Sequence, residues 1–310
     1  MSRPGKRRTG GVGYVDLQVN GYLGVDFSSP DLTVDGVRQV TEALVARGTD
    51  AYCPTIVTVP LATYRAVLPV LAAAMAEPDL RPHLLGIHIE GPFITPEARG
   101  AHQQSLIRKA DAALFDRWQD LAEGHIRMLT LAPEQEGASK LIRHAVRRGV
   151  VVSLGHHLAD KTSIDRAVDA GAACCTHLGN GIPNVLPRHP NPIWTQLADD
   201  RLTGMFITDG HHLPPEFVQV ALRAKGLRRT IITSDAASVA GLPPGEYDAM
   251  GDRVVLEKSG RLAMKHSASL AGSSATLAEC VEWLRSWSGL NEQELTQIAR
   301  TNPLRLLACG

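Results

Sequence analysis

Residues 84–92 read LLGIHIEGP, an apolar run that ends in a glutamate followed by the turn residues glycine and proline. Apolar runs of similar length recur along the chain, and amphipathic stretches of helical period separate them. Strands that alternate with helices in this way favour parallel βαβ units. Working outward from this stretch gives eight predicted strands, at 14–19, 51–57, 84–89, 126–131, 150–154, 172–176, 204–208 and 230–233.

The amphipathic stretches predict the helices. They lie at 37–47, 61–75, 139–148, 163–170, 215–225, 276–287 and 291–300. Because the strands are mostly apolar and do not alternate, both faces of the sheet should be covered. Eight units in about 290 residues match an α/β fold of the (β/α)8 TIM-like barrel type, with an open doubly wound sheet as the alternative. We expect the barrel at 14–307, after a basic and disordered start at 1–13.

The composition sets limits on partners and location. Of the 310 residues, 44% are hydrophobic and 21% charged, with 32 Lys and Arg against 32 Asp and Glu. This neutral balance gives no reason to expect nucleic acid or a membrane as a partner. No apolar run is long enough to span a membrane, no signal peptide precedes the first strand, and the five cysteines form no CxxC pair. We therefore expect a cytoplasmic protein without a disulfide framework.

Polar and ionisable residues gather at the ends of the predicted strands. In a barrel the carboxyl ends of the strands meet at one rim, which is where active sites lie. Buried without partners, such groups would destabilise the fold by roughly several kcal/mol each, so a shared site is the simplest explanation. The strand ends concerned read DLQVNG (16–21), HIEGP (88–92), GHH (155–157), THLGNG (176–181), TDGHH (208–212) and SDA (234–236).

One carboxylate and two imidazoles stand out among these strand ends: Glu90, His156 and His177. A single histidine at a strand end is more often structural, but three such ligands on one rim favour one catalytic divalent metal ion. We expect zinc (Zn2+), with Fe2+ or Mn2+ as alternatives that suit the same ligands. His157 should instead be packed away from the centre, because successive strand residues point in opposite directions.

Asp235 ends the eighth predicted strand. A carboxylate that faces the metal site can take a proton from the attacking water and later deliver it to the leaving amine. An aspartate after a strand is also a common N-cap for the next helix, so its position in isolation leaves both roles open. Taken together with the metal ligands, the pattern favours the catalytic role.

In their order along the chain, the motifs resemble those of the N-acetylglucosamine-6-phosphate deacetylases, which are metal-dependent amidohydrolases. They are GIHIEGPF (86–93), VSLGH (152–156), CTHLGN (175–180), ITDGHH (207–212), ITSD (232–235), LAGS (270–273) and NP (302–303). Each motif alone is weakly specific, whereas the ordered set is strong. The resemblance implies a hydrolase barrel that removes acetate from N-acetylglucosamine 6-phosphate, or from a related N-acetylhexosamine 6-phosphate.

The resemblance also implies roles for single residues. Glu90, His156 and His177 look like the metal ligands, Asp235 looks like the acid and base, and His102 would stabilise the developing oxyanion. Substrate contacts are implied for Ala101, His102, Asn180, Gly181, Arg188, His212, Leu270, Ala271 and Gly272. In relatives the arginine at the place of Arg188 binds the phosphate in the neighbouring subunit's site, which implies a homodimer.

Three departures from the family pattern bear on these expectations. Gln18 and Asn20 stand where many amidohydrolases carry His-x-His, so we expect one tightly held metal ion. The family's small β-sandwich should be absent or vestigial, because few residues flank the barrel. Gly179 and His157 replace other residue types in the pocket wall and bear on which sugar is accepted.

Two other functions fit the sequence. A different amidohydrolase, acting on an N-acyl or cyclic amide without a phosphate, would keep the metal ligands and would not need Arg188. A catalytically inactive barrel that serves as a binding module is the second alternative. The presence of Asp235 together with all three predicted ligands argues against it.

Overall fold

The computed structural model describes residues 13–267 and 269–308. Its centre is a parallel sheet of eight strands in the order β1-β4-β5-β6-β7-β8-β9-β10. The strands are β1 (Tyr14–Val19), β4 (Thr49–Ile56), β5 (Ile87–Glu90), β6 (Ile126–Leu131), β7 (Val151–Leu154), β8 (Cys174–Cys175), β9 (Thr203–Ile207) and β10 (Thr230–Thr233). A parallel bridge between Val19 and Ala236 joins the two edges, so the sheet nearly closes. The predicted (β/α)8 fold is confirmed, and the open doubly wound sheet was the wrong alternative.

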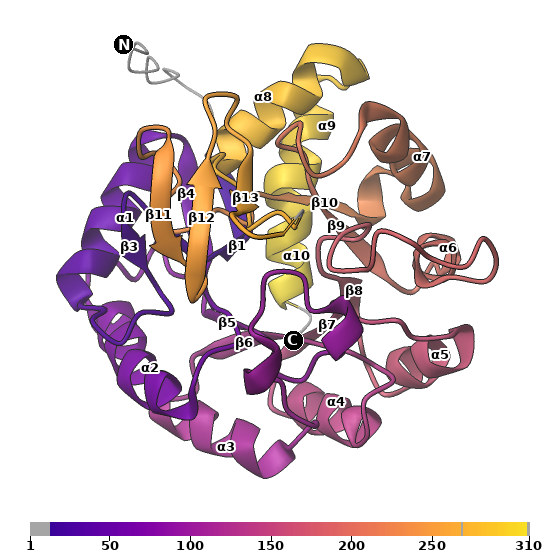
Figure 1. Cartoon of the computed structure of the whole chain (residues 1–310), viewed down its shortest axis with the longest axis horizontal. Coiled ribbons are helices and arrows are strands. Elements are labelled where there is room, and N and C mark those ends of the chain that lie inside the picture. The colour runs from indigo at the N-terminus through magenta and orange to yellow at the C-terminus, as the bar shows by residue number, and fades with distance from the viewer. Residues whose placement is uncertain (1–12, 268, 309–310) are drawn as a thin grey trace.

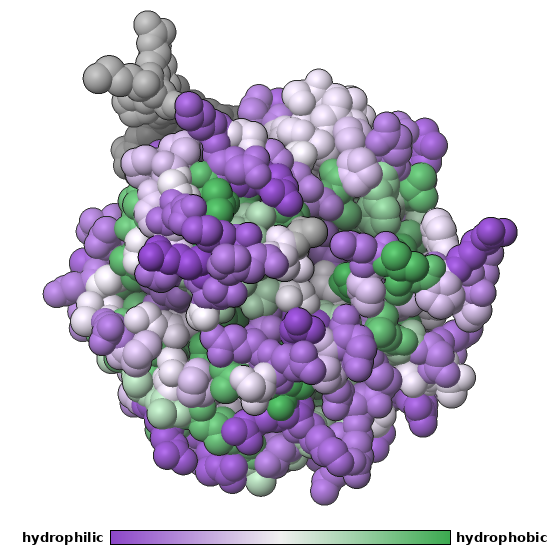
Figure 2. Space-filling view, viewed as in Figure 1, coloured by the Kyte–Doolittle hydropathy of each residue, from purple (hydrophilic) through white to green (hydrophobic). Residues whose placement is uncertain are grey.

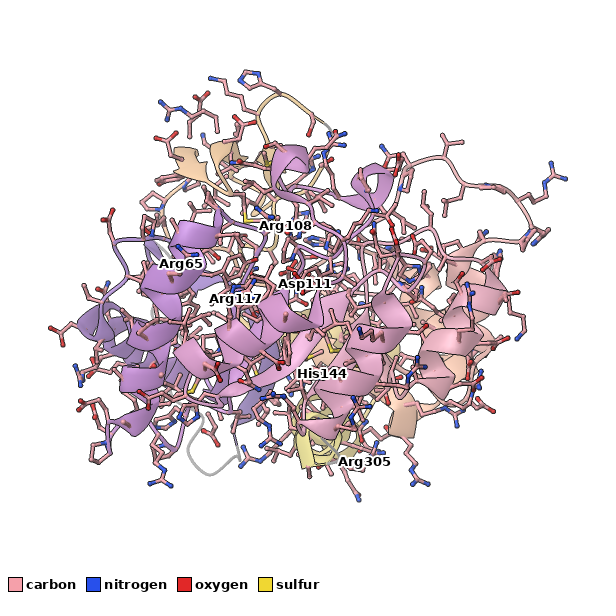
Figure 3. The ribbon with its side chains drawn as sticks, turned by 90° about the horizontal axis from the view of Figure 1, so that it is seen from below. Arg65, Arg108, Asp111, Arg117, His144 and Arg305 are labelled. Carbon is pink, nitrogen blue, oxygen red and sulfur yellow. The ribbon has the colours of Figure 1, made fainter. Side chains whose placement is uncertain are left out.

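Most of the helices surround the barrel in chain order, and the last one lies at its centre in the view of Figure 1. They are α1 (Val34–Ala46), α2 (Leu61–Ala76), α3 (Ala112–Leu121), α4 (Ala138–Arg147), α5 (Lys161–Asp169), α6 (Pro192–Ala198), α7 (Pro215–Lys225), α8 (Leu277–Ser288), α9 (Glu292–Thr296) and α10 (Asn302–Ala308). A π-helical turn, Gln297–Thr301, joins α9 to α10, and short 3-10 turns occupy Pro96–Ala98, Gln104–Leu106 and Leu227–Arg229. Figure 3 shows the outer helices in a view turned by 90° from Figure 1, with His144 of α4 labelled. His144 Nε2 lies 2.7 Å from Asp116 Oδ1 of α3.

Two apolar layers explain why the strands are mostly apolar and do not alternate. The larger cluster lies between the strands and the surrounding helices. The smaller one fills the barrel interior near the amino ends of the strands, where Leu306 and Leu307 of α10 pack against Val15 and Met205. Both faces of the sheet are therefore buried, as the sequence pattern predicted. Burial also raises the pKa of the Cys174 thiol to about 12, as expected of a cysteine that packs in an apolar core.

The structure adds a small antiparallel sheet that the sequence did not predict. It comprises β11 (Gly245–Ala249), β12 (Asp252–Leu256) and β13 (Leu262–Met264), inserted between β10 and α8. Its apolar side packs on the segment that follows β10, with Ala237, Val239, Val254, Leu256, Leu262 and Ala271 in one cluster. Hydrophilic residues prevail on its outer side in Figure 2. In the described part of the chain, a short hairpin of β2 (Gly21–Tyr22) and β3 (Val25–Asp26) is the other sheet outside the barrel.

Some expectations fall outside what the structure describes. The basic start at 1–13 lies outside the described residues except for Gly13, whose backbone N–H donates to the Asp50 carboxylate at 3.1 Å. Cys309 is likewise not among them. Across 13–267 and 269–308, no helix combines the length and the apolar character needed to cross a membrane.

Candidate active site

The carboxyl ends of the barrel strands open into a cavity of about 530 Å³. This is the rim at which the sequence analysis expected the ionisable strand ends to converge. Many residues singled out from the sequence line it: Glu90, Ala101, His102, His156, His177, Asn180, Gly181, His212, Asp235, Leu270 and Gly272. The strand ends and the loops that follow them thus bring together side chains that lie far apart in the sequence.

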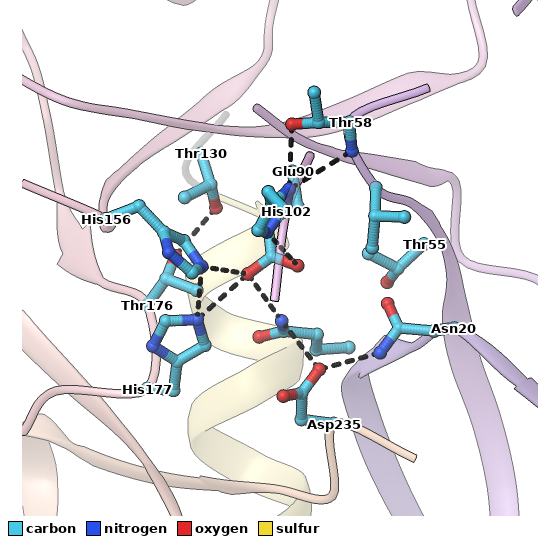
Figure 4. A network of polar contacts seen from close by, with 12 residues as sticks. Asn20, Thr55, Thr58, Glu90, His102, Thr130, His156, Thr176, His177 and Asp235 are labelled. Carbon is cyan, nitrogen blue, oxygen red and sulfur yellow. Dashed lines mark hydrogen bonds and ion pairs between the residues drawn. The ribbon is translucent and has the colours of Figure 1, made fainter. Parts of the chain in front are cut away.

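Glu90, His156 and His177 meet in a tight, buried group, drawn in Figure 4. The Glu90 Oε1 atom lies 2.9 Å from His177 Nε2 and 3.3 Å from His156 Nε2, and the two nitrogens are 3.0 Å apart. Burial acts to raise the pKa of Glu90, but the hydrogen bonds and charges of the two histidines outweigh it and hold this pKa well below its usual range. Glu90 is therefore an ionised carboxylate beside two imidazoles.

This group fits a divalent metal ion. His156 Nδ1 lies 2.9 Å from the Ala98 carbonyl oxygen, which can only accept, so Nδ1 carries the hydrogen. A metal ion that replaces the proton between Nε2 and Glu90 would then meet the lone pair of Nε2, as in a metal-ligating histidine held by a backbone carbonyl. Ligand atoms about 2.0–2.1 Å from a tetrahedral zinc ion are roughly 3.3 Å apart. The three contacts of 2.9–3.3 Å approach that spacing.

His102 also lies in this cluster, yet its hydrogen bonds suit a different role. Ligand atoms of Glu90, His102 and His156 all lie within 4.8 Å of one another. However, His102 Nδ1 accepts the backbone N–H of Thr58 at 3.3 Å and lies 2.7 Å from the Thr58 hydroxyl. Burial, and next the charge of His156, lowers the pKa of His102 to about 3, so the ring is neutral. Its hydrogen must then be on Nε2, which makes this atom a donor and not a metal ligand.

Asp235 lies beside this cluster, held by two amides. Gln18 Nε2 donates to Asp235 Oδ1 at 2.9 Å, and Asn20 Nδ2 donates to the same oxygen at 2.7 Å. Gln18 Nε2 also contacts Glu90 Oε1 at 2.8 Å and so bridges the two carboxylates. Burial, and then the charge of Glu90, raises the pKa of Asp235 to about 7. The carboxyl group can therefore hold or release a proton near neutral pH.

Three residues of this group have unusual backbone conformations. His156, His177 and Asp235 have φ angles of +53°, +31° and +52°, in the left-handed region that side chains with a Cβ rarely adopt. Such strain persists where surrounding structure enforces it, and it clusters at functional sites. Gly181, at φ +62°, passes directly against the rings, because a Cβ there would lie 2.9 Å from both His156 Nδ1 and His177 Cε1. Glycine at 181 lets the loop close over the histidines.

With the geometry established, comparisons with known proteins are informative. No family model matches the chain. The N-acetylglucosamine-6-phosphate deacetylase of Danio rerio is 34% identical, over 95% of this chain and 74% of the relative. The N-acetylgalactosamine-6-phosphate deacetylase of Escherichia coli O157:H7 is 32% identical, over 95% and 77%. The chain belongs to the N-acetylglucosamine-6-phosphate deacetylase family. A structure of a variant of the Mycobacterium smegmatis member, in complex with N-acetyl-D-glucosamine-6-phosphate, has a TM-score of 0.88 at 29% identity, covering 96% of this chain and 77% of that one.

Family membership confirms the resemblance noted from the sequence and places the chain among hydrolases of the amidohydrolase superfamily. These enzymes are metal-dependent, and the buried carboxylate and imidazoles described above suit such an ion. The identity of the metal and the role of each single residue stay predictions at this point.

Two residues that were expected to contact the substrate do not line the cavity of this chain. Arg188 is exposed in the loop before α6 and does not line the cavity of its own chain. Ala271 is fully buried in the apolar cluster of the small sheet, and it is its neighbours Leu270 and Gly272 that reach the cavity. His157 is buried, with Nε2 2.5 Å from the Gln196 side-chain nitrogen, which is the packed position expected for it.

The sequence analysis missed other cavity residues. Met250 and Arg261 line the cavity from the small sheet, whose strands the pattern did not predict. Gln18 and Asn20 were noted for what they replace, but not as donors to the carboxylates. The signal was present, since both amides stand two residues apart at the end of a strand and so face the same side.

Proposed function

We propose that this protein hydrolyses the acetamido group of N-acetylglucosamine 6-phosphate, or of a related N-acetylhexosamine 6-phosphate, giving acetate and the amino-sugar 6-phosphate. One observation carries the proposal. The buried Asp235 carboxyl group lies in the same cavity as the cluster of Glu90, His156 and His177. The relatives named above act on sugars of this class, and the galactosamine enzyme among them keeps the epimer open.

Glu90, His156 and His177 would hold one divalent metal ion, zinc in the first place and Fe2+ or Mn2+ as alternatives. When bound, such an ion polarises the acetamide carbonyl and makes a water molecule more acidic. One ion is expected, because Gln18 and Asn20 fill the second position with amide donors that point at Asp235.

Asp235 moves the proton in this reaction. Gln18 and Asn20 both bind its Oδ1, which leaves Oδ2 as the basic oxygen. Asp235 takes a proton from water as the water oxygen bonds to the acetamide carbon. When the C–N bond breaks, Asp235 returns that proton to the amine nitrogen. The second proton of the water leaves the acetic acid product and is also taken up by the amine, so atoms and charge balance with acetate and the ammonium form of the amino sugar as products.

His102 stabilises the charge that develops on the acetamide oxygen. Its Nε2–H donor is fixed by the contact of Nδ1 with Thr58, so the donor is aimed before substrate arrives. Ala101, Asn180, Gly181, His212, Leu270 and Gly272 are proposed as further substrate contacts because they line the same cavity. Ala271 is not among them, because it is buried in the apolar cluster of the small sheet.

Arg188 is proposed to act in a homodimer, where it would reach the phosphate in the partner's cavity. Its exposure in the loop before α6 supports this, because an arginine that reaches a partner must lie at the surface of its own chain. Sedimentation velocity tests the assembly, and a monomer under assay conditions would contradict it. Cytoplasmic location is proposed with it and is tested by cell fractionation.

Acetate release from a panel of N-acetylhexosamines and their 6-phosphates tests the proposed function. We expect the metal-loaded protein to release acetate from a 6-phosphate, with the epimers ranked by rate. Release only from non-phosphorylated amides would favour another amidohydrolase activity. No release from any member of the panel by metal-loaded, folded protein would reject the proposal.

A further inference from the structure

The turn that joins β12 to β13 brings a positive charge to the cavity. Arg261, at the end of this turn, is the one lysine or arginine among the described residues that line the cavity. The proposed reaction does not use it. Arg188, the cation expected from the family, does not line the cavity of its own chain. The substrate of the proposed function carries a phosphate dianion, so a cation on the cavity wall needs an explanation.

The turn is firmly held in place. Within it, the Glu257 N–H donates to the Arg261 carbonyl at 2.9 Å, and the Gly260 N–H donates to the Glu257 carbonyl at 3.0 Å. Two contacts then tie it to the barrel rim. His211 Nε2, after β9, lies 3.2 Å from the Ser259 carbonyl oxygen, and Ser274 Oγ donates to the Gly260 carbonyl at 2.5 Å. The backbone that carries Arg261 is therefore positioned before a ligand arrives.

One edge of the Arg261 guanidinium is available. Its Nη1 donates to Glu257 Oε1 at 2.9 Å, while Nε and Nη2 form no hydrogen bond or ion pair with the described residues. Nε and Nη2 form the side edge of the guanidinium, and two parallel N–H donors suit two oxygens of one phosphate. Glu257 orients the group through the opposite side without occupying this edge.

Arg261 is the one permanently charged cation among the described residues that line the cavity, and this favours an anion beside it. Glu90 and Asp235 lie at the buried end, next to the histidines. His211 and His212 line the cavity from the end of β9, and His211 contacts the turn of Arg261 directly. A sugar whose acetamido group lies between His102 and Asp235 leaves its far end for the cavity wall.

We propose that Arg261 binds the substrate's 6-phosphate from within the same chain, and so determines the preference for phosphorylated sugars. This inference rests on the proposed function for the placement of the acetamido group. It makes Arg261 a specificity-determining residue supplied by the small sheet, acting beside any arginine that a partner contributes.

The test compares Arg261→Met and Arg261→Lys with the control Arg253→Met. Arg253 lies on β12 and pairs with Asp248 at 3.2 Å, but it does not line the cavity. The measured quantity is kcat/KM for N-acetylglucosamine 6-phosphate divided by kcat/KM for N-acetylglucosamine. We expect this ratio to fall at least tenfold in Arg261→Met, mainly through a higher KM, and less in Arg261→Lys. The control should keep the wild-type ratio.

Several outcomes would overturn the inference. An equal loss on both sugars would show a structural role, and a ratio like that of the control would show no role. If the ratio of the two kcat/KM values falls in Arg188→Met but stays at the wild-type value in Arg261→Met, the phosphate contact belongs to Arg188. Because the contact lies within one chain, the effect of Arg261→Met should also be the same at every protein concentration.

Binding separates this inference from the proposed function. Calorimetry with glucosamine 6-phosphate and glucosamine needs no turnover. If no acetate is released from any sugar, the proposed function fails, yet at least tenfold weaker binding of glucosamine 6-phosphate to Arg261→Met would still support the phosphate contact. Equal binding to wild type and variant, or no binding of this phosphate to either, would overturn it.

Discussion

Replacing Asp235 by asparagine separates its chemical role from its effect on the fold. The two amide donors, Gln18 and Asn20, both bind Oδ1 at 2.9 and 2.7 Å. An asparagine can offer its carbonyl oxygen at that place, and its amino group then takes the place of Oδ2. The substitution therefore keeps the shape and the hydrogen bonds while it removes the charge and the basic oxygen.

The activity should fall by a large factor. A positioned general acid and base contributes about 10²–10⁴ in rate, which equals about 3–5 kcal/mol of transition-state stabilisation. We expect Asp235→Asn to lose acetate release by this factor while it retains bound metal, because the proposed ligands are other residues. Turnover within tenfold of wild type would remove Asp235 from its role.

The stability of the metal-free protein should change in the opposite direction. Burial and Glu90 raise the pKa of Asp235 from 3.8 to about 7, so the unfolded chain releases this proton at lower pH than the folded one. The ionised carboxyl group destabilises the fold as pH rises above 3.8, by up to about 4 kcal/mol beyond pH 7. Asp235→Asn removes this penalty, so it should be more stable at pH 8 and within about 1 kcal/mol of wild type at pH 4.

Urea unfolding of chelator-treated protein at both pH values measures this difference. Asp209→Asn is the matched control, since it also changes an aspartate at a strand end. Burial would raise the pKa of Asp209, but His212 lowers it to about 2. Its replacement should therefore destabilise the protein at pH 8, by about 2 kcal/mol. A less stable Asp235→Asn variant at pH 8 would refute the electrostatic reasoning.

Three further outcomes are expected. Dialysis against a chelator should abolish acetate release, and added Zn2+ should restore it. His177→Asn should lower the metal content, as measured by mass spectrometry. Full activity after complete metal removal would contradict the proposed metal site. His157, whose pKa is lowered to about 3 by burial and next by His156, stays neutral when folded but takes up a proton when unfolded below pH 6.5. Stability is thus lost as pH falls, and His157→Gln should reduce the loss between pH 7 and pH 5 by about 2 kcal/mol; an unchanged loss would show that His157 is not buried and neutral. Gly181→Ala should destabilise the protein by about 1–3 kcal/mol and weaken metal binding, because its Cβ would contact both rings at φ +62°; wild-type metal affinity would indicate a more open loop.

The sequence predicted the barrel because its strands are buried on both faces. Mostly apolar runs such as 126–131 keep their predicted bounds, here as β6, and their ends locate the rim. The small sheet was not predicted, because its strands are short and are buried on one face only. β11 alternates between partly buried and exposed residues, as in GEYDA, and packs on only one side. Such a short, half-polar strand carries little hydrophobic signal before its partners are known.

The site was predicted to the level of residue types, but not of hydrogen positions. Strand ends indicated that Glu90, His156 and His177 would converge, and their contacts are as short as 2.9 Å. The sequence did not show which ring nitrogen carries the hydrogen in His156 and in His102. A carbonyl from residue 98 fixes one ring and an N–H from residue 58 fixes the other, and both contacts depend on loops that only the fold brings together.

The amides at 18 and 20 explain how two buried carboxylates remain compatible. Glu90 and Asp235 would repel each other if both were ionised, and the Gln18 amino group donates to both. The oxygens of these amides, Gln18 Oε1 and Asn20 Oδ1, are buried and accept no hydrogen bond from the described residues. The side-chain N–H groups of Gln18 and Asn20 are thus directed toward the carboxylates, while their side-chain oxygens are left without a hydrogen-bond donor. A second metal ion beside Gln18 and Asn20 would face those N–H groups. The arrangement therefore favours one metal ion, beside the histidines, and a proton on the Asp235 carboxyl group.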